Sequence, residues 1–257
     1  MTLAITTWGT GAPLVLLHGF FADSGAFDHL RDALKSFRVT APDLPGHGAS
    51  APATSWDAAL EELRITVPQQ PFFLAGYSMG ARLAVSFALR WSQAVRALLL
   101  ESGSAGIADA DERAQRRSDD EQLARFVVRS GVAAFVARWE NHPTLASQKD
   151  LSPWMLAVVR ERRLRQSSEG LASALRHLGS GAQPPLWDDL HRLRTPVLLV
   201  AGERDAKFSD VARRMAAAIP AARVTLVPNS GHSPHLEAPD RYASALATFF
   251  TQHGGDR

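Results

Sequence analysis

The pentapeptide Gly76-Tyr77-Ser78-Met79-Gly80 restricts the possible fold of this chain more than any other segment. An apolar run, Phe72 to Ala75, precedes it, and a stretch with helical spacing, Ala81 to Leu89, follows it. A strand that turns sharply into a helix through G-x-S-x-G holds its serine exposed at the tip of a strained turn. Glycine is needed on both sides because the neighbouring backbone leaves no room for a Cβ atom. The pattern therefore predicts that Ser78 is a nucleophilic serine.

Short apolar runs recur along the chain between amphipathic stretches. Parallel strands that are covered on both faces show such continuous, rather than alternating, hydrophobicity. The stretches between them, such as Ser24 to Phe37 and Ser55 to Val67, have helical spacing. This alternation predicts an α/β fold with a mostly parallel, doubly wound sheet. The runs interpreted as buried strands are Leu14–Leu17, Val39–Ala41, Phe72–Ala75, Leu98–Leu100, Val197–Val200 and Val224–Val227.

The alternation stops after Glu101. From about Gly106 to Trp187 no strand-like run occurs, and the segment holds charged, arginine-rich helical stretches such as Asp111 to Arg129 and Ser152 to Arg165. We interpret residues 106–187 as a helical cap. It is expected between the sixth and seventh strands of a core that is formed by residues 1–105 and 188–257.

Composition narrows the class of protein. The 257 residues, of which 46% are hydrophobic, suffice for one continuous core with an insertion. Cysteine is absent, which excludes disulfides and thiolate metal sites. No run approaches the ~20 apolar residues of a membrane span, and the N-terminal residues do not resemble a signal peptide. We therefore expect a cytoplasmic protein without a membrane partner, either a monomer or a small homo-oligomer.

The charge pattern gives no support for a nucleic-acid partner. The formal net charge is +2, and the basic residues are scattered among acids rather than gathered in a stripe. The sequence also lacks a glycine-rich phosphate loop and a zinc-binding pattern, so we expect neither a cofactor nor a metal.

Two further strand ends supply partners for Ser78. Asp205 lies just beyond the run that ends at Val200, and His232 lies beyond the run that ends at Val227. A serine hydroxyl needs a base to accept its proton and a third group to orient that base. The chain order Ser, Asp, His follows a known arrangement on α/β sheets, whose sites form at the carboxyl ends of the strands. The alternatives are that Asp205 only caps the following helix and that His232 is a structural loop residue.

The turn after the run Leu14–Leu17 supplies a candidate oxyanion hole. His18-Gly19-Phe20 follows that run, and there the N–H groups of Phe20 and Met79 would both point at the space above Ser78. Each such donor is typically worth ~10²–10³ in rate. The later loop from Asp43 to Ser50 is rich in glycine, and His47 within it has no evident catalytic role.

With these residues the chain resembles the α/β-hydrolase superfamily over nearly its whole length. The resemblance implies an α/β-hydrolase fold and a nucleophilic serine, but it says little about the substrate because this fold hosts many chemistries. The segments that carry it are His18–Phe20, Asp43–Ser50, Gly76–Gly80, Gly202–Asp205 and Gly231–His232.

Arginines near the serine point to an anionic substrate. Arg82 follows Ser78 by one helical turn and so lies on the same side of its helix. A buried arginine is costly without an anion to pair with, although Arg82 could instead project sideways to a structural carboxylate. The predicted cap holds further groups of arginines, at 113–117, at 138 and at 162–165.

At these positions the chain also resembles a narrower family, the 2-succinyl-6-hydroxy-2,4-cyclohexadiene-1-carboxylate (SHCHC) synthases of menaquinone biosynthesis. The resemblance covers both the core and the cap. One departure is Gly103-Ser104-Ala105-Gly106-Ile107, where the family usually has a proline before the second glycine. The shared features are Gly76–Arg82, Glu112–Asp120 with Leu123–Phe126 after it, Trp139 shortly before Pro143, Leu164-Arg165 five residues before Gly170, and Gly202–Asp205 followed by Lys207-Phe208.

The narrower resemblance implies a specific site. Three arginines that hold a tricarboxylate small-molecule substrate fall on Arg82, Arg116 and Arg165, and Tyr77 and Trp139 line the pocket. The register around Arg116 is ambiguous because Arg113 and Arg117 are close to it.

The same resemblance implies loss of pyruvate from 2-succinyl-5-enolpyruvyl-6-hydroxy-3-cyclohexene-1-carboxylate. Our hypothesis is that Ser78, made basic by His232 and Asp205, removes a proton next to the succinyl ketone. The enolate oxygen would then occupy the hole formed by Phe20 and Met79, and the enolpyruvyl group would leave.

Two alternative functions remain open at this point. A serine hydrolase, either a carboxylesterase or a carbon–carbon bond hydrolase, would use the same three residues. A non-catalytic ligand receptor on the same fold would keep its function without the Ser78 hydroxyl.

Overall fold

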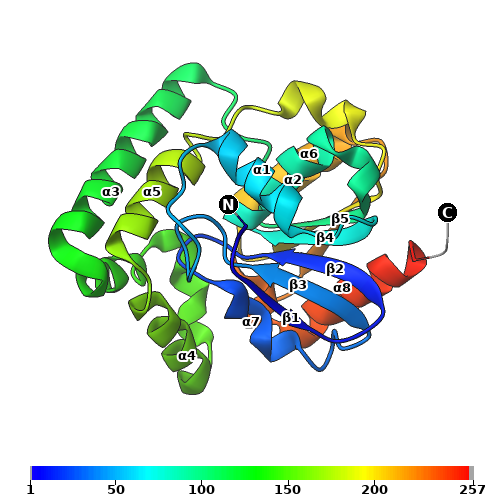
Figure 1. The fold of residues 1–257 in the computed structure, drawn as a ribbon, viewed down its shortest axis with the longest axis horizontal. Helices are drawn as coiled ribbons and strands as arrows, with labels where there is room; N and C mark the ends of the chain where they lie inside the picture. Colours follow the sequence, from blue (N-terminus) through cyan, green and yellow to red (C-terminus); the bar gives the residue numbers. More distant parts are fainter. Residues whose placement is uncertain (1, 255–257) are drawn as a thin grey trace.

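A seven-stranded sheet forms the centre of the molecule in the computed structural model, which describes residues 2–254. The strand order is β1-β3-β2-β4-β5-β6-β7, and all neighbouring pairs are parallel except β1 with β3. The strands, shown in Figure 1, are β1 Ile5–Trp8, β2 Ala12–Leu17, β3 Phe37–Pro42, β4 Phe72–Tyr77, β5 Val95–Glu101, β6 Val197–Gly202 and β7 Ala222–Val227.

All six apolar runs that were expected as strands are strands of this sheet, and the α/β-hydrolase fold is confirmed. The sequence analysis missed β1, a four-residue edge strand whose side chains alternate between exposed and half-buried. Among residues 2–254, five strands, β1 to β5, precede the cap, whereas six were expected. The inserted helices therefore lie between the fifth and sixth strands, one position earlier than expected.

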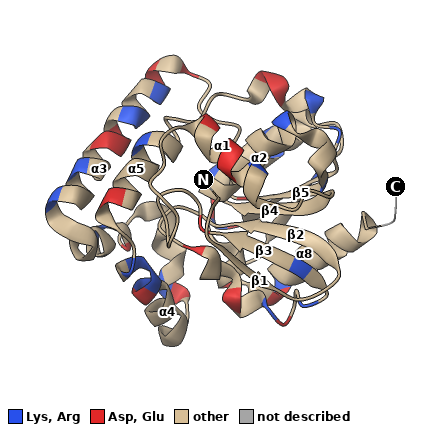
Figure 2. Cartoon of the chain, in the orientation of Figure 1, with Lys and Arg blue, Asp and Glu red and all other residues tan. Residues whose placement is uncertain are grey.

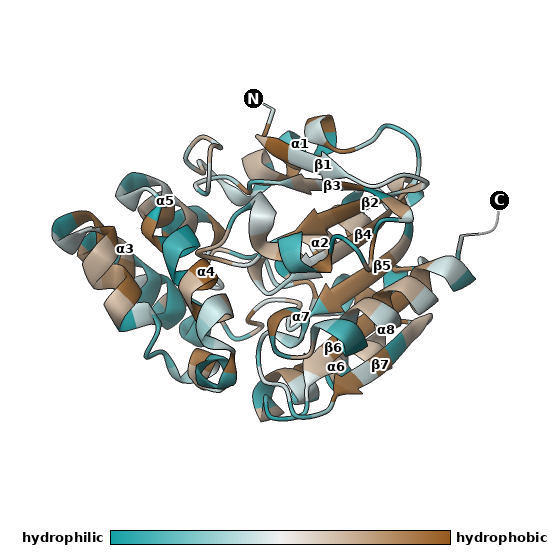
Figure 3. Cartoon of the chain, turned by 90° about the horizontal axis from the view of Figure 1, so that it is seen from below, coloured by the Kyte–Doolittle hydropathy of each residue, from teal (hydrophilic) through white to brown (hydrophobic). Residues whose placement is uncertain are grey.

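Helices cover both faces of the sheet, whose strands carry mostly apolar residues (Figure 3). One face packs against α1 (Trp56–Thr66), α2 (Met79–Arg90) and α6 (Ala206–Ala218). The other face packs against the 3₁₀ helix η1 (Ser24–Leu30) and α8 (Pro239–Gln252). The shorter helices are η2 (Ser92–Ala94), η4 (Trp187–Arg192) and α7 (Pro234–Glu237).

The expected helix from Ser24 to Phe37 is wrong in type and length. The segment forms the 3₁₀ helix η1 and then turns before β3. Phe27 and Leu30, its two buried residues, are three positions apart. Because side chains at i and i+3 eclipse in a 3₁₀ helix, this spacing is enough to bury both against the sheet without a full α-helix.

The chain between β5 and β6 forms a separate layer of helices beside the sheet (Figure 1). It consists of α3 (Ala110–Trp139), the 3₁₀ helix η3 (Pro143–Asp150), α4 (Pro153–Leu164) and α5 (Ser168–Leu178). Helix α3 is kinked at Gly131, which has a φ of 79°. We call these helices the cap; they lie within the predicted segment 106–187.

The cap has a small apolar core of its own, to which α3 contributes Phe135 and α5 contributes Leu171, and Phe21 of the sheet domain joins them. Basic and acidic residues alternate along α3, whereas α4 carries three arginines and one glutamate (Figure 2). Within residues 2–254, no helix has both the length and the hydropathy to cross a lipid bilayer.

Candidate active site

Ser78 occupies a strained turn between β4 and α2. Its φ of 50° and ψ of −106° lie outside the regions that ordinary residues favour. The glycines on either side permit this geometry. A Cβ atom on Gly76 would lie 2.5 Å from the carbonyl carbon of Gly80, and one on Gly80 would lie 2.2 Å from the carbonyl oxygen of Leu17. The backbone is therefore held in the conformation that the pentapeptide predicts.

Ser78, His232 and Asp205 form a continuous hydrogen-bonded series. His232 Nε2 lies 3.2 Å from Ser78 Oγ, and His232 Nδ1 lies 2.8 Å from Asp205 Oδ2. Asp205 has a second role, because its Oδ1 accepts the N–H of Phe208 at 3.1 Å and caps α6. Asp205 can therefore both orient His232 and cap α6, since each of its oxygens accepts from a different donor.

The loop that carries His232 is fixed by a carboxylate that the sequence analysis missed. Glu237 accepts the backbone N–H groups on both sides of His232, from Gly231 at 2.5 Å and from Ser233 at 3.1 Å. Its Oε1 also accepts the hydroxyl of Ser147, from η3 of the cap, at 3.0 Å. The only signal in the sequence is an acid five residues after the histidine, and it has no meaning until the loop is folded.

The two backbone groups expected to form an oxyanion hole lie at the same edge. Met79 is the first residue of α2, so its N–H has no partner within the helix. Phe20 and Met79 both line the cavity that Ser78 faces.

His47, to which no role was assigned, holds the loop that presents Phe20. Its Nε2 accepts the N–H of Phe21 at 3.1 Å, and burial lowers the pKa of His47 to about 3. A neutral imidazole is the form that can accept this bond. His47 therefore fixes the loop backbone as an uncharged acceptor.

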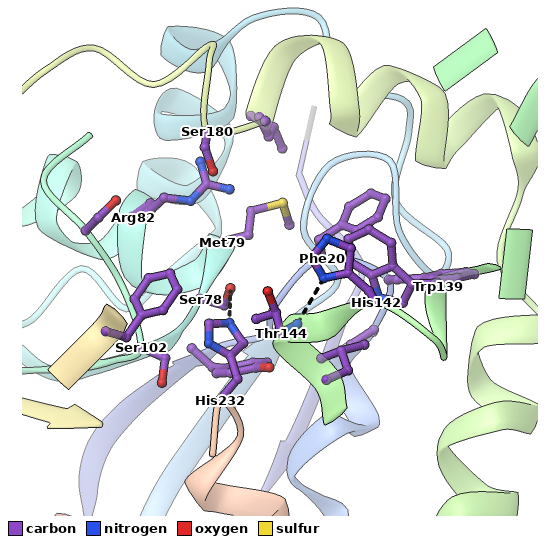
Figure 4. A pocket seen from close by; sticks show the side chains of 18 of the residues that line it. Phe20, Ser78, Met79, Arg82, Ser102, Trp139, His142, Thr144, Ser180 and His232 are labelled. Atoms are coloured by element: carbon purple, nitrogen blue, oxygen red, sulfur yellow. Dashed lines mark hydrogen bonds between the residues drawn. The ribbon is translucent and has the colours of Figure 1, made fainter. Parts of the chain in front are cut away.

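A cavity of about 980 Å³ lies between the strand ends and the cap. Figure 4 shows Ser78, Met79 and Arg82 projecting into it from α2, with Trp139 and His142 on the side of the cap. Asp205 lies behind His232, outside the lining. Of the predicted site residues, those that line the cavity are Phe20, Tyr77, Ser78, Met79, Arg82, Arg116, Trp139 and His232.

Arg82 is a cation buried in the cavity wall. Arg82 is 7% exposed, and its Nη1 has no hydrogen-bond partner among the described residues. Burial, together with the positive charge of Arg116, lowers the pKa of Arg82 to about 10. The guanidinium lies over the ring of Trp56, 5.8 Å from its centroid. Asp120 is near enough to attract it electrostatically, but that carboxylate forms its ion pair with Arg116. An anion in the cavity would supply the partner that Arg82 lacks.

Of the three neighbouring arginines on α3 at 113, 116 and 117, Arg116 is the one that lines the cavity. Its Nε donates to Asp120 Oδ1 at 2.9 Å, and its side chain remains 41% exposed. The two neighbours that made the register ambiguous point elsewhere. Arg113 donates to the carbonyl of Ile107 at 2.8 Å, and Arg117 donates to the carbonyl of Gly181 at 2.7 Å.

The structure does not place Arg165 at the cavity, which corrects the expectation for this residue. Its side chain is 63% exposed and pairs with Glu161 at 3.2 Å. Arg162 and Arg163 line the cavity instead. Arg165 is the C-cap residue that follows α4, and its side chain turns back along the exposed side of the helix to Glu161.

Tyr77 and Trp139 line the cavity from different layers, Tyr77 from the end of β4 and Trp139 from the end of α3 in the cap. Tyr77 Oη is 2.7 Å from Ser233 Oγ, and burial raises the pKa of Tyr77 far above its usual value, so the phenol stays protonated. The ring of Trp139 packs edge-on against Phe20, with the centroids 5.2 Å apart, and stacks on His142.

The sequence and the fold of this chain resemble those of known proteins. The model of the alpha/beta hydrolase family matches residues 14–245. A protein of Bacillus subtilis (strain 168), named as a candidate 2-succinyl-6-hydroxy-2,4-cyclohexadiene-1-carboxylate synthase, is 36% identical over 93% of this chain and 90% of its own length. A protein of Klebsiella pneumoniae subsp. pneumoniae that carries the name of the same synthase is 31% identical over 96% of this chain and 97% of its own. A solved structure of MenH from S. aureus superposes with a TM-score of 0.93 at 32% identity, covering 99% of this chain and 100% of that one.

Proposed function

This chain belongs to the alpha/beta hydrolase family and, within it, to the SHCHC synthases, and on that premise we propose that it eliminates pyruvate from 2-succinyl-5-enolpyruvyl-6-hydroxy-3-cyclohexene-1-carboxylate. The single observation that carries the proposal is Arg82. A buried guanidinium whose Nη1 has no hydrogen-bond partner among residues 2–254 lies one helical turn from Ser78, in the same cavity. A site for neutral esters has no need of such a group, whereas a substrate with three carboxylates supplies its partner.

The hydrogen-bonded series of Ser78, His232 and Asp205 supplies the base for proton removal. His232 accepts the hydroxyl proton of Ser78, and Asp205 holds the imidazole in the tautomer that can do so. The Ser78 oxygen then removes the proton from the carbon next to the succinyl ketone. The bonding electrons move onto the ketone oxygen, and the N–H groups of Phe20 and Met79 stabilise the resulting enolate.

Collapse of the enolate completes the elimination. The electrons return from the enolate oxygen and form a ring double bond between C2 and C3. The existing double bond between C3 and C4 shifts to C4 and C5, and the carbon–oxygen bond from C5 to the enolpyruvyl group breaks. The proton held by His232 passes to the departing enolpyruvate, which becomes pyruvate. Ser78 is left with the proton taken from carbon, so the three residues return to their starting state.

The charged wall of the cavity orients the substrate. Arg82 and Arg116 lie close enough for the charge of Arg116 to lower the pKa of Arg82, and Asp120, which pairs with Arg116, offsets part of their positive charge. Forked hydrogen bonds from guanidinium groups to carboxylates give both affinity and orientation. Arg162 and Arg163 also line the cavity, but the charge of Arg162 is balanced by ion pairs with Asp23 and Asp28.

The test is direct. The purified protein is given the cyclohexene substrate, and pyruvate is followed with a coupled lactate dehydrogenase assay. We expect pyruvate release that S78A abolishes without loss of folded structure. Rapid cleavage of p-nitrophenyl esters with no pyruvate above background would instead identify a serine hydrolase. Binding of a ligand that S78A leaves unchanged, with neither pyruvate release nor ester cleavage in the wild-type protein, would point to a non-catalytic receptor.

A further inference from the structure

A series of four buried polar side chains connects helix α4 of the cap to the residue before Ser78. Arg163 Nη2 donates to Gln148 Oε1 at 2.9 Å, and Gln148 Nε2 donates to Ser233 Oγ at 2.9 Å. Ser233 Oγ in turn lies 2.7 Å from Tyr77 Oη. All four residues are buried, with Ser233 fully so. We call this series the Arg163–Tyr77 relay.

The direction of the relay follows from its donors and acceptors. A guanidinium has only donors, so Gln148 must present its oxygen to Arg163 and its NH₂ group to Ser233. Ser233 Oγ accepts that N–H and retains one hydrogen. Among residues 2–254, Tyr77 Oη is the other hydrogen-bond partner of this hydroxyl. A buried hydroxyl hydrogen needs an acceptor, so Ser233 donates to Tyr77.

The phenolic hydrogen of Tyr77 is therefore not used within the relay. Tyr77 lines the cavity, where a ligand oxygen can accept this hydrogen. Each bond of the relay points the same way and begins at a buried cation, and hydrogen bonds aligned in this manner strengthen one another.

We propose that Arg163, Gln148 and Ser233 are positioning residues that orient the Tyr77 hydroxyl as a hydrogen-bond donor to an anionic oxygen of the bound substrate. The identity of that substrate rests on the proposed function. The direction of the relay does not, because it follows from the hydrogen bonds of the protein alone. Tyr77 directly precedes Ser78 in the chain, and Ser233 directly follows His232. The relay therefore connects helix α4 to a neighbour of each of these two residues.

The substitution Q148E tests the direction with little change of shape. A carboxylate accepts hydrogen bonds and does not donate them, so Ser233 would turn its hydrogen toward the new carboxylate. Tyr77 would then donate to Ser233, and its hydrogen would point away from the cavity. The pairing with Arg163 is retained, so the variant should remain folded.

Infrared spectroscopy reads the direction without any substrate. The C–O stretching band of a tyrosine differs between a phenol that accepts a hydrogen bond and one that only donates. The chain has two tyrosines, so the difference spectrum between the wild-type protein and Y77F assigns the band of Tyr77. We expect Q148E to move this band from the accepting to the donating position. An unchanged band in a folded Q148E protein would overturn the proposal.

Kinetics then test the consequence. Loss of one hydrogen bond to the substrate in Q148E should lower kcat for pyruvate release about 10-fold. Y77F should give a similar loss, and the double variant should be no slower than Y77F. The Y77F background also controls for the added negative charge. An equal loss from Q148E in both backgrounds would overturn the proposal. If the wild-type protein releases no pyruvate, the proposed function fails, while the infrared band still decides the direction of the relay.

Discussion

Replacement of Arg82 by methionine should stabilise the ligand-free protein while it removes activity. Burial and the charge of Arg116 lower the Arg82 pKa to about 10, which corresponds to roughly 3 kcal/mol of unfavourable surroundings for the charged form. Methionine conserves much of the volume and removes the charge. Part of the gain is offset by the lost contact with Trp56 and the lost attraction to Asp120. We expect R82M to raise the free energy of unfolding by about 1–3 kcal/mol.

The pH dependence of this gain has a definite sign. The folded-state pKa of Arg82 lies below the unfolded value, so at neutral pH both states carry the proton and the cost is present in full. It is relieved only as the pH rises through about 10. The gain from R82M should therefore be constant around neutral pH.

The assay is urea unfolding followed by circular dichroism, with a thermal melt in parallel. A stabilisation of this size should raise Tm by about 2–12 °C. R165M is the matched control, because Arg165 is an exposed arginine that pairs with Glu161, and it should change the free energy of unfolding by less than about 0.5 kcal/mol. Pyruvate release should fall steeply in R82M and little in R165M. A less stable R82M protein, or one with full turnover, would refute the reasoning.

Two further substitutions test the geometry around Ser78. D205N should keep the cap of α6, since asparagine is an equally good capping residue, yet lower pyruvate release by about 10²–10⁴ because it no longer orients His232 correctly. Steady-state kinetics and a thermal melt separate the two effects, and a large drop in Tm would mean that the loss of activity is structural. G80A should destabilise the fold by about 3 kcal/mol or more, since its Cβ would meet the Leu17 carbonyl oxygen at 2.2 Å. G131A, whose Cβ would meet nothing within 4 Å, should cost about 1–3 kcal/mol in the same urea titration, because its φ of 79° and ψ of 166° suit glycine alone. A cost for G131A that exceeds the cost for G80A would contradict this account.

Local patterns were sufficient to predict the sheet and the meeting of Ser78, Asp205 and His232 at one of its edges. A parallel strand buried on both faces leaves a continuous apolar run, and all six such runs are strands. Ser78, Asp205 and His232 each follow a strand within a few residues, so strand ends alone bring them to one edge. The edge strand β1 left a weaker signal, because its side chains are only partly buried.

Contacts between distant segments could not be predicted in this way. Glu237 becomes a ligand of the His232 loop only when α7 folds back on that loop, and Gln148 meets Ser233 across 85 residues of sequence. Neither residue belongs to a pattern with a local meaning. Their partners are backbone or hydroxyl groups, which any sequence offers in large numbers.

By itself, then, the sequence determined the α/β sheet, the strained turn at Ser78 and the positions of Asp205 and His232 after their strands, because strand burial and turn chemistry depend on neighbours in the chain. The tertiary structure alone decided which arginines of the cap face the cavity. Helix α4 and its C-cap residue carry Arg162, Arg163 and Arg165 within one turn, and the apolar residues of the helix do not form one stripe, since Trp154 and Leu164 are exposed. Its rotation is therefore fixed by packing against the rest of the molecule, which turns Arg163 inward and leaves Arg165 in solvent.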